Sequence, residues 1–255
     1  MKIGIIGIGN MGSAIAKGLL GKNELFLSNR GSNLEFFKDK EVSIMENRKV
    51  VENSDYIILA VKPNYYKNVI DEIKDLLENK VFISIAAGFT LEKLENLLGS
   101  DKKIVMTMPN TPASVGEGMS ILCPNRSVSD DEFSNALEIF SSFGKAIKID
   151  ENQFDAASVV NGCLPAFVDL FIEGLSDGAV LCGLKRDVSY KLIAQTIIGS
   201  AKLMEESGEH PGLLKDKVTS PKGTTIEGVK ALEENNFRAG LIKAVEASFN
   251  KAKNM

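Results

Sequence analysis

The sequence has little histidine and little cysteine, which narrows the kinds of site it can form. His210 is the only histidine among 255 residues, so a metal centre built from several histidines is excluded by count. Cys123, Cys163 and Cys182 are far apart and form no C-x-x-C pair, so the sequence indicates neither a zinc site nor a disulfide framework. We expect no metal site, and we expect reduced thiols, as in a cytoplasmic protein.

A strong charge of one sign and long apolar runs are also missing. The 30 basic residues face 34 acidic ones, for a net charge of −4, which gives no electrostatic argument for nucleic acid binding. No run approaches the roughly 18 apolar residues of a membrane span, and no secretory signal pattern opens the chain. Hydrophobic residues make up 44% and charged residues 25%, as in a globular protein. We expect a cytoplasmic location and neither nucleic acid nor a membrane as a partner.

The most informative stretch is the glycine-rich sequence at residues 7–12. It follows an apolar run at residues 2–6 that is predicted to be a buried strand, and it precedes a predicted helix at residues 13–20. In this strand–turn–helix context, G-x-G-x-x-G is typical of a turn that binds a dinucleotide. The alternative is an ordinary strand–helix turn that contains glycine.

Each residue of this turn has a predicted part in holding the cofactor. Gly7 would permit the tight turn, Gly9 would let backbone N–H groups approach a pyrophosphate, and Gly12 would let the helix pack close to the strand. Asn10 and Met11 lie in the turn just before the predicted helix, whose unpaired N–H groups and dipole favour phosphate. The sequence therefore predicts a dinucleotide site here.

Strands and helices are predicted to alternate as far as residue 150. The predicted strands are residues 2–6, 24–30 (running into a polar turn), 55–61, 81–85, 104–108, 118–123 and 146–149. The predicted helices are residues 13–20, a stretch that starts at residue 47, and residues 63–78, 91–98 and 130–143. Such alternation is typical of a parallel sheet with helices on both faces. We predict an α/β fold with a Rossmann-type dinucleotide-binding domain at residues 1–150.

The end of the second strand bears on the choice between NADPH and NADH. Ser28, Asn29 and Arg30 stand there and provide no carboxylate, whereas an NAD site usually places an acid at this point to bind the ribose 2′-OH. A guanidinium can pair with a 2′-phosphate, and Asn47 could add a contact. We expect NADPH as the cofactor with NADH as the alternative, unless Arg30 is simply a solvated turn residue.

The ends of the later strands should complete the cofactor site, because ligands of such sheets bind beyond the carboxyl ends of the strands. The small residues of one end would leave room for the nicotinamide ribose, and Lys62 and Asn110 are placed nearest the reacting ring. Turn chemistry alone is the alternative for each of them. The expected cofactor contacts at these ends are Ala60, Val61, Lys62, Pro63, Ala86, Ala87, Gly88, Asn110 and Pro112.

From residue 151 to 255 the alternation stops and only helices are predicted. Their ranges are residues 153–161, 165–182, 186–207, a short piece around 213, 221–234 and 237 to the end. Several are apolar on more than one face and need burial on all sides. We therefore predict a second, all-helical domain that forms a homodimer or a higher homo-oligomer.

Residues 216–225 contain a candidate anion site. Ser220 is a plausible N-cap and Pro221 suits the first position of a helix, so Lys222 to Thr225 would form its first turn. Unpaired N–H groups and the hydroxyls of Thr224 and Thr225 would bind a carboxylate there. A well-capped helix without a ligand is the alternative.

These motifs together resemble the pyrroline-5-carboxylate reductase family along the whole chain. The matching segments are residues 7–12, 60–63, 86–88, 108–112, 162–167 and, most specifically, 216–225. The resemblance implies a dinucleotide domain followed by a helical domain that interlocks with its partner's. It also implies hydride transfer from NAD(P)H to the C=N carbon of pyrroline-5-carboxylate, which yields L-proline.

The resemblance also implies roles for individual residues. Ser220, Gly223 and Thr224 would bind the substrate carboxylate, and Thr225 would offer its hydroxyl to the ring nitrogen. Lys222 is also expected at the substrate, although the resemblance does not imply it. Thr225 and Lys62 are the expected catalytic residues, with Lys62 shaping the nicotinamide end. A protonated imine is already electrophilic, so orientation rather than a strong general acid is the main requirement.

Two departures from the family pattern concern substrate and rate. Leu164 and Lys222 each stand where the family usually has glycine, and Phe167 stands where tyrosine is common. Leu164 would narrow the pocket or enter the helical core, and Lys222 would add a cation or face solvent. The alternatives are a related reductase of another small imine or 2-oxo acid, and a non-catalytic regulator that binds NADP(H).

Overall fold

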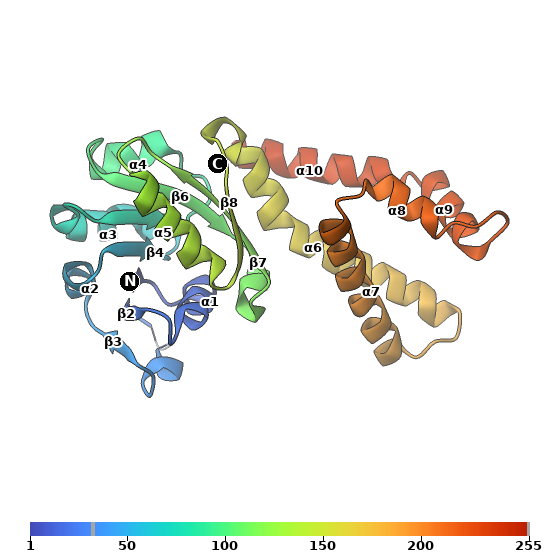
Figure 1. Cartoon of the computed structure of the whole chain (residues 1–255), viewed down its shortest axis with the longest axis horizontal. Coiled ribbons are helices and arrows are strands. Elements are labelled where there is room, and N and C mark those ends of the chain that lie inside the picture. Colours follow the sequence, from blue (N-terminus) through green and yellow to red (C-terminus); the bar gives the residue numbers. More distant parts are fainter. Residues whose placement is uncertain (32–33, 254–255) are drawn as a thin grey trace. The chain divides into compact units, whose positions relative to one another are not determined.

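The computed structural model describes residues 1–31 and 34–253 (Figure 1). Contacts divide it into two compact units. Unit 1 comprises Met1–Pro165 together with the residues from Phe249 onward, and unit 2 comprises Ala166–Ser248. The chain is α/β, with all its described strands in unit 1, as the sequence predicts.

Unit 1 is built on one eight-stranded sheet with the strand order β3-β2-β1-β4-β5-β6-β7-β8. The strands are β1 (Lys2–Ile6), β2 (Glu24–Ser28), β3 (Val42–Ile44), β4 (Tyr56–Leu59), β5 (Val81–Ser84), β6 (Lys103–Pro109), β7 (Gly118–Pro124) and β8 (Gly144–Lys148). The helices are α1 (Asn10–Leu19), α2 (Asn47–Asn53), α3 (Tyr66–Ile73), α4 (Leu91–Leu98) and α5 (Asp130–Ser141), with short 3-10 segments η1 (Glu35–Phe37), η2 (Pro63–Tyr65), η3 (Lys74–Leu76) and η4 (Thr111–Val115). The predicted helix at residues 63–78 is thus α3 with a 3-10 turn at each end.

The sheet differs from the predicted parallel sheet at one junction. β6 and β7 pair antiparallel, with Thr107 opposite Leu122, while β7 and β8 are parallel to each other. The reason is the connection, because η4 is too short for the crossover that a parallel neighbour requires. β3 is a further strand that the sequence did not predict; it has three residues and an exposed Ile44 at the sheet edge.

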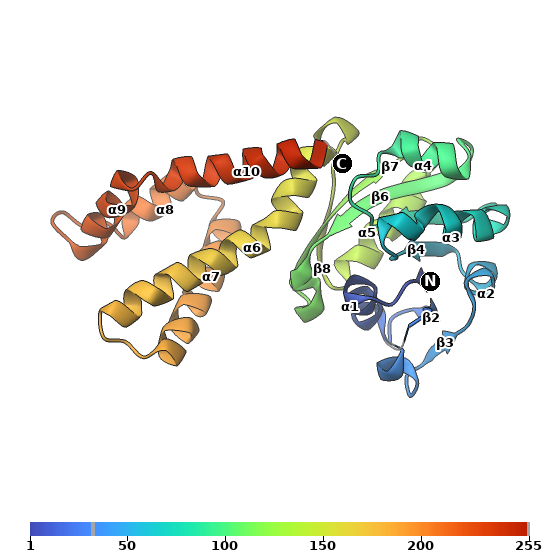
Figure 2. The ribbon, with the colours of Figure 1, turned by 180° about the vertical axis from the view of Figure 1, so that it is seen from behind.

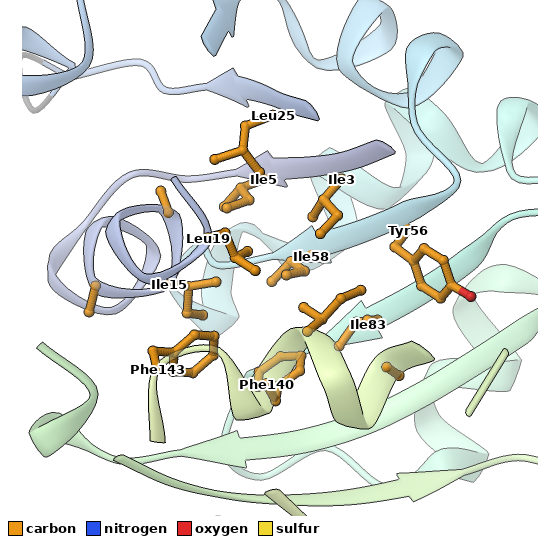
Figure 3. Close-up of a cluster of buried hydrophobic side chains, with 14 of the residues drawn as sticks. Ile3, Ile5, Ile15, Leu19, Leu25, Tyr56, Ile58, Ile83, Phe140 and Phe143 are labelled. Carbon is orange, nitrogen blue, oxygen red and sulfur yellow. The ribbon is translucent and has the colours of Figure 1, made fainter. Parts of the chain in front are cut away.

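Both faces of the sheet are covered by helices. Along β4, Ile58 faces α1 and α5, and its neighbour Ile57 faces α2, α3 and α4, as the alternation of a strand requires. Figure 3 shows the first of these clusters, in which Ile5 and Ile83 of the sheet meet Ile15 of α1 and Phe140 of α5. Burial on both faces explains the continuous apolar runs of the strands.

The helix α6 (Glu151–Leu181) starts in unit 1 and ends in unit 2. The prediction of two helices that are separated before Pro165 is wrong, because Pro165 lies inside this single helix. A proline there removes one backbone hydrogen bond, which Asn161 would otherwise accept, but the helical pattern continues on both sides of it.

Unit 2 consists of the second half of α6 with α7 (Arg186–Ser207), α8 (Pro211–Lys217), α9 (Thr224–Glu234) and the first part of α10 (Phe237–Lys253) (Figure 2). Buried Ser176 and Ser189 join α6 to α7 through their hydroxyls, and Arg186 donates to Ser176 at 3.1 Å. By length and composition alone α6 could also cross a membrane, and little of its apolar stretch is buried within the chain. Core helices of assembled soluble proteins have the same composition.

Candidate functional site

The glycine turn between β1 and α1 is tightly folded at Gly7 and Gly12 and open at Gly9. Gly7 has φ +100°, and a Cβ added to Gly12 would lie 2.0 Å from the carbonyl oxygen of Gly7. Both positions therefore need glycine for the fold itself. Gly9 is the N-cap of α1, and a Cβ there would meet nothing within 4 Å. The backbone at Gly9 is therefore open to a ligand, beside the unpaired N–H groups of Asn10 and Met11.

Hydrogen bonds tie this turn to the end of β2. The N–H of Gly7 donates to the carbonyl oxygen of Ser28 at 2.8 Å. The N–H of Ile8 donates to Oδ1 of Asn29 at 3.2 Å. The predicted pyrophosphate and ribose contacts are thus parts of one connected structure.

The structure brings together the residues predicted to contact the 2′-phosphate and adds an acid to them. Ser28 Oγ donates to Asn47 Oδ1 at 2.7 Å, and Asn47 Nδ2 donates to Glu72 Oε2 at 2.9 Å. Arg30 is highly exposed and lies 3.7 Å from the same Glu72 oxygen. Glu72 was not among the predicted site residues, since it comes from α3, and nothing in its sequence spacing pairs it with β2.

The acids on either side of Glu72 are neutralised by other partners. Two lysines, Lys67 and Lys74, bind the Asp71 carboxylate and lower its pKa to about 2. Arg48 forms a two-pronged pair with Asp75, which lowers the pKa of Asp75 and raises that of Arg48.

The ends of β4 and β5 lie over a buried tyrosine. Tyr66 donates from its hydroxyl to the carbonyl oxygen of Leu59 at 2.7 Å and accepts from Ser84 Oγ at 3.1 Å. Burial raises the pKa of the Tyr66 hydroxyl, so it stays protonated. Lys62, beyond the end of β4, is exposed and precedes η2.

The predicted cofactor contacts at these two strand ends differ in their exposure. Ala60 and Val61 are half-buried and Pro63 is exposed. Ala86 is buried, whereas Ala87 and Gly88 are exposed small residues. Because their side chains are small, Ala87 and Gly88 leave space beyond the end of β5, which the predicted ribose contact requires.

Asn110 forms hydrogen bonds that hold the connection between β6 and β7. Its Oδ1 accepts from the N–H of Met119 at 2.9 Å, and its Nδ2 donates to Asn161 Oδ1 at 3.1 Å. Asn161 of α6 in turn donates to the carbonyl oxygens of Met108 and Met119. Asn110 therefore fastens the β6–η4–β7 connection, which includes half-buried Pro112; a contact from either residue to the cofactor remains a prediction.

The turn before α9 differs from its prediction. α9 begins at Thr224 with Gly223 as the N-cap, so the prediction that Pro221 starts the helix is wrong. The N–H of Gly223 donates to the carbonyl oxygen of Ser220 at 3.0 Å, which closes a β-turn over Pro221 and Lys222. This turn keeps the backbone out of the helix until Thr224. Thr225 is exposed beside the unpaired N–H groups of the first helical turn, so an anion site at this helix start remains a prediction.

The structure shows the backbone and the exposure of the residues that depart from the family pattern. Lys222 has φ +59°, a left-handed conformation that glycine adopts most easily, so the usual glycine there suits the turn itself. Leu164 is 47% exposed on α6 and does not enter the core of the chain. Phe167 is half-buried.

Comparisons with known proteins match separate families to the first and the last part of the chain. Residues 2–88 match the family "NADP oxidoreductase coenzyme F420-dependent", and residues 151–255 match "Pyrroline-5-carboxylate reductase dimerisation". Pyrroline-5-carboxylate reductase of Escherichia coli is 41% identical over 263 residues, covering 100% of this chain and 98% of the relative. The Arabidopsis thaliana enzyme of that name is 38% identical, covering 100% and 95%.

Two solved structures share the fold over nearly their full length. Plasmodium falciparum pyrroline carboxylate reductase, with NADP bound, is 38% identical with a TM-score of 0.90, covering 100% of this chain and 97% of that one. Pyrroline-5-carboxylate reductase from Coxiella burnetii is 36% identical with a TM-score of 0.93, covering 99% and 97%.

Proposed function

Because the chain belongs to the pyrroline-5-carboxylate reductase family, we propose that it reduces pyrroline-5-carboxylate to L-proline with NADPH. NADH is the alternative cofactor. The observation that carries the proposal is the presence, in one chain, of an open glycine turn in unit 1 and an anion-binding helix start in unit 2.

The residues of unit 1 fit the cofactor. The N–H groups at the start of α1 would bind the pyrophosphate, with Gly9 leaving the approach open. Ser28, Arg30 and Asn47 would contact the 2′-phosphate. When bound, NADPH would supply the hydride. Ala87 and Gly88 would leave room for its nicotinamide ribose, and Lys62 would lie near the nicotinamide ring.

The residues before and within α9 fit the other reactant. Ser220, Lys222, Gly223 and Thr224 would bind the carboxylate, largely through N–H groups that the helix leaves unpaired. Thr225 would direct its hydroxyl at the ring nitrogen. An imine protonated at that nitrogen is electrophilic without further help, so the task of these residues is to orient its carbon for hydride transfer.

We also propose that the working form is a homodimer or a higher homo-oligomer in the cytoplasm. Unit 2 leaves large apolar side chains such as Leu170 and Leu192 exposed, and a second copy of the chain would cover them. That partner would also account for the apolar surface of α6 without a membrane.

The direct test is NADPH oxidation in the presence of pyrroline-5-carboxylate. Thr225→Ala should lower kcat/KM about 10- to 100-fold, as expected for one lost hydrogen bond to a charged group. Thr225→Ser should retain most activity, and both variants should bind NADPH as the wild type does. Absence of turnover in the wild type would overturn the proposal, and full kcat/KM in Thr225→Ala would remove that residue's role.

A second candidate substrate is another small imine or a 2-oxo acid. It is favoured by Lys222, whose exposed cation adjoins the proposed carboxylate site, and by half-exposed Leu164. A panel of such compounds, compared with pyrroline-5-carboxylate by kcat/KM, separates the two candidates.

A further inference from the structure

The carboxyl end of β2 has no acidic residue, but Glu72 of α3 places a carboxylate close to it. Glu72 is partly exposed, and its Oε2 accepts a 2.9 Å hydrogen bond from Nδ2 of Asn47, which is 8% exposed. Asn47 in turn accepts from Ser28 Oγ. A carboxylate thus lies close to the end of β2, where an NAD site usually has one, although it comes from a different element.

This carboxylate holds Arg30 only loosely. The two groups are 3.7 Å apart and the Arg30 side chain is 81% exposed, so the pair is weak and the guanidinium can turn to another anion. Asp71, the residue before Glu72, is bound by two lysines of its own at 2.7 and 2.8 Å. Glu72 is therefore the acid of this helix whose charge faces the Arg30 and Asn47 groups.

Two consequences follow for the adenine ribose. A 2′-phosphate that pairs with Arg30 would lie close to the Glu72 carboxylate, and like charges at short range repel. A 2′-OH would instead find in Glu72 an acceptor, as in NAD sites. Glu72 would therefore weaken the binding of NADPH and strengthen the binding of NADH.

We propose that Glu72 is a specificity-determining residue that sets the balance between NADPH and NADH, opposing the 2′-phosphate and accepting the 2′-OH. It also acts as a positioning residue, because its bond to Asn47 fixes the direction of that amide for either cofactor. The inference rests on the proposed function, in that this site binds a nicotinamide dinucleotide.

The test is the dissociation constant of each cofactor, measured by calorimetry without any imine. Glu72→Gln keeps an oxygen that can accept from Asn47 and removes the charge. This variant should bind NADPH more tightly and NADH more weakly than the wild type. The ratio of the two dissociation constants should shift about tenfold in favour of NADPH, the size expected for one partly exposed charge pair. A ratio within about twofold of the wild type, or a shift toward NADH, would overturn the inference.

Glu72→Ala separates the two roles, because it removes the charge and the acceptor together. Both cofactors should bind more weakly than to Glu72→Gln, while the ratio still shifts toward NADPH. The matched control is Asp71→Asn, which removes a charge one residue away on α3. Its ratio should equal that of the wild type, and a shift as large as that of Glu72→Gln would overturn the specific role of Glu72.

Turnover of pyrroline-5-carboxylate by the wild type, measured in parallel, distinguishes the two proposals. Turnover combined with an unchanged ratio in Glu72→Gln overturns this inference alone. A shifted ratio in a chain without turnover overturns the proposed reaction alone. A wild type that binds neither dinucleotide overturns both.

Discussion

The two units of this chain bury their apolar residues to different degrees. In unit 1, strand residues such as Ile5, Ile58 and Phe82 are fully buried between helices. In unit 2, Leu170 and Leu192 are more than half exposed. The same kinds of side chain are therefore core in one unit and surface in the other.

The difference shows which unit can complete its core alone. A sheet covered on both faces is a finished layered structure, and unit 1 has that form. Unit 2 instead carries an apolar groove of about 770 Å³ between α6, α7 and α8, lined by residues that include Phe171, Leu192 and Met204. An exposed apolar groove of this kind fits the homo-oligomer proposed above, in which a second copy of unit 2 would cover it with matching apolar faces.

The largest expected effect comes from placing a charge on that surface. Leu192→Arg should leave the isolated fold intact, since the side chain is already 57% exposed, but should weaken self-association by about 2 kcal/mol or more. Light scattering after size exclusion should show a shift to monomer, with a lower Tm. Ile44→Arg, at a similarly exposed position on β3 of unit 1, is the control and should stay dimeric. If Leu192→Arg stayed dimeric, the proposed role of the exposed apolar surface of unit 2 in self-association would be contradicted.

A smaller effect is expected from two glycines of unit 1. Substitution of one should reduce the stability of the fold, and substitution of the other should reduce only cofactor binding. Gly12→Ala places a methyl group 2.0 Å from the carbonyl oxygen of Gly7, so it should destabilise the fold by about 1–3 kcal/mol and abolish cofactor binding. Gly9→Ala, whose methyl group meets no protein atom, should leave stability within about 0.5 kcal/mol and weaken only cofactor binding. Denaturant unfolding and calorimetry measure the two quantities. Equal stability losses in both variants would refute the distinction.

The smallest expected effect concerns the turn of unit 2. Lys222→Gly should stabilise the fold by about 0.5–1 kcal/mol, because it relieves a left-handed backbone at φ +59°. Lys222→Ala removes the same charge but keeps the strain, and should give no gain. Thermal unfolding of the two variants decides between the two causes, and an equal gain in Lys222→Ala would attribute the effect to the lost charge instead of the backbone strain.

Much of unit 1 could be predicted from the sequence, because its signals are local. The apolar run of β1, the spacing of Gly7, Gly9 and Gly12, and the strand–helix alternation all act over a few residues. The structure confirms the α/β fold and seven of the predicted strands. The direction of β7 was beyond reach, because periodicity does not distinguish parallel from antiparallel neighbours.

What could not be predicted depends on contacts between distant residues. Glu72 reaches Asn47 from another helix, and Asn161 reaches the β6–β7 connection from α6, at separations that leave no sequence pattern. Pro165 looked like a helix start because that is its commonest use. The domain boundary at residue 150 stays a prediction: contacts group the chain to Pro165 with unit 1, while the dimerisation family begins at residue 151.

The bond from the Ile8 N–H to Asn29 has a consequence for the entropy of binding. Together with the bond from Gly7 to Ser28, it sets the shape of the glycine turn before any cofactor arrives. A turn that is already ordered loses little conformational freedom when a ligand binds, so more of the contact energy remains as affinity. Because the same bonds hold the end of β2, the predicted adenosine and pyrophosphate contacts are fixed relative to each other. We therefore expect a dinucleotide to bind both without rearranging either.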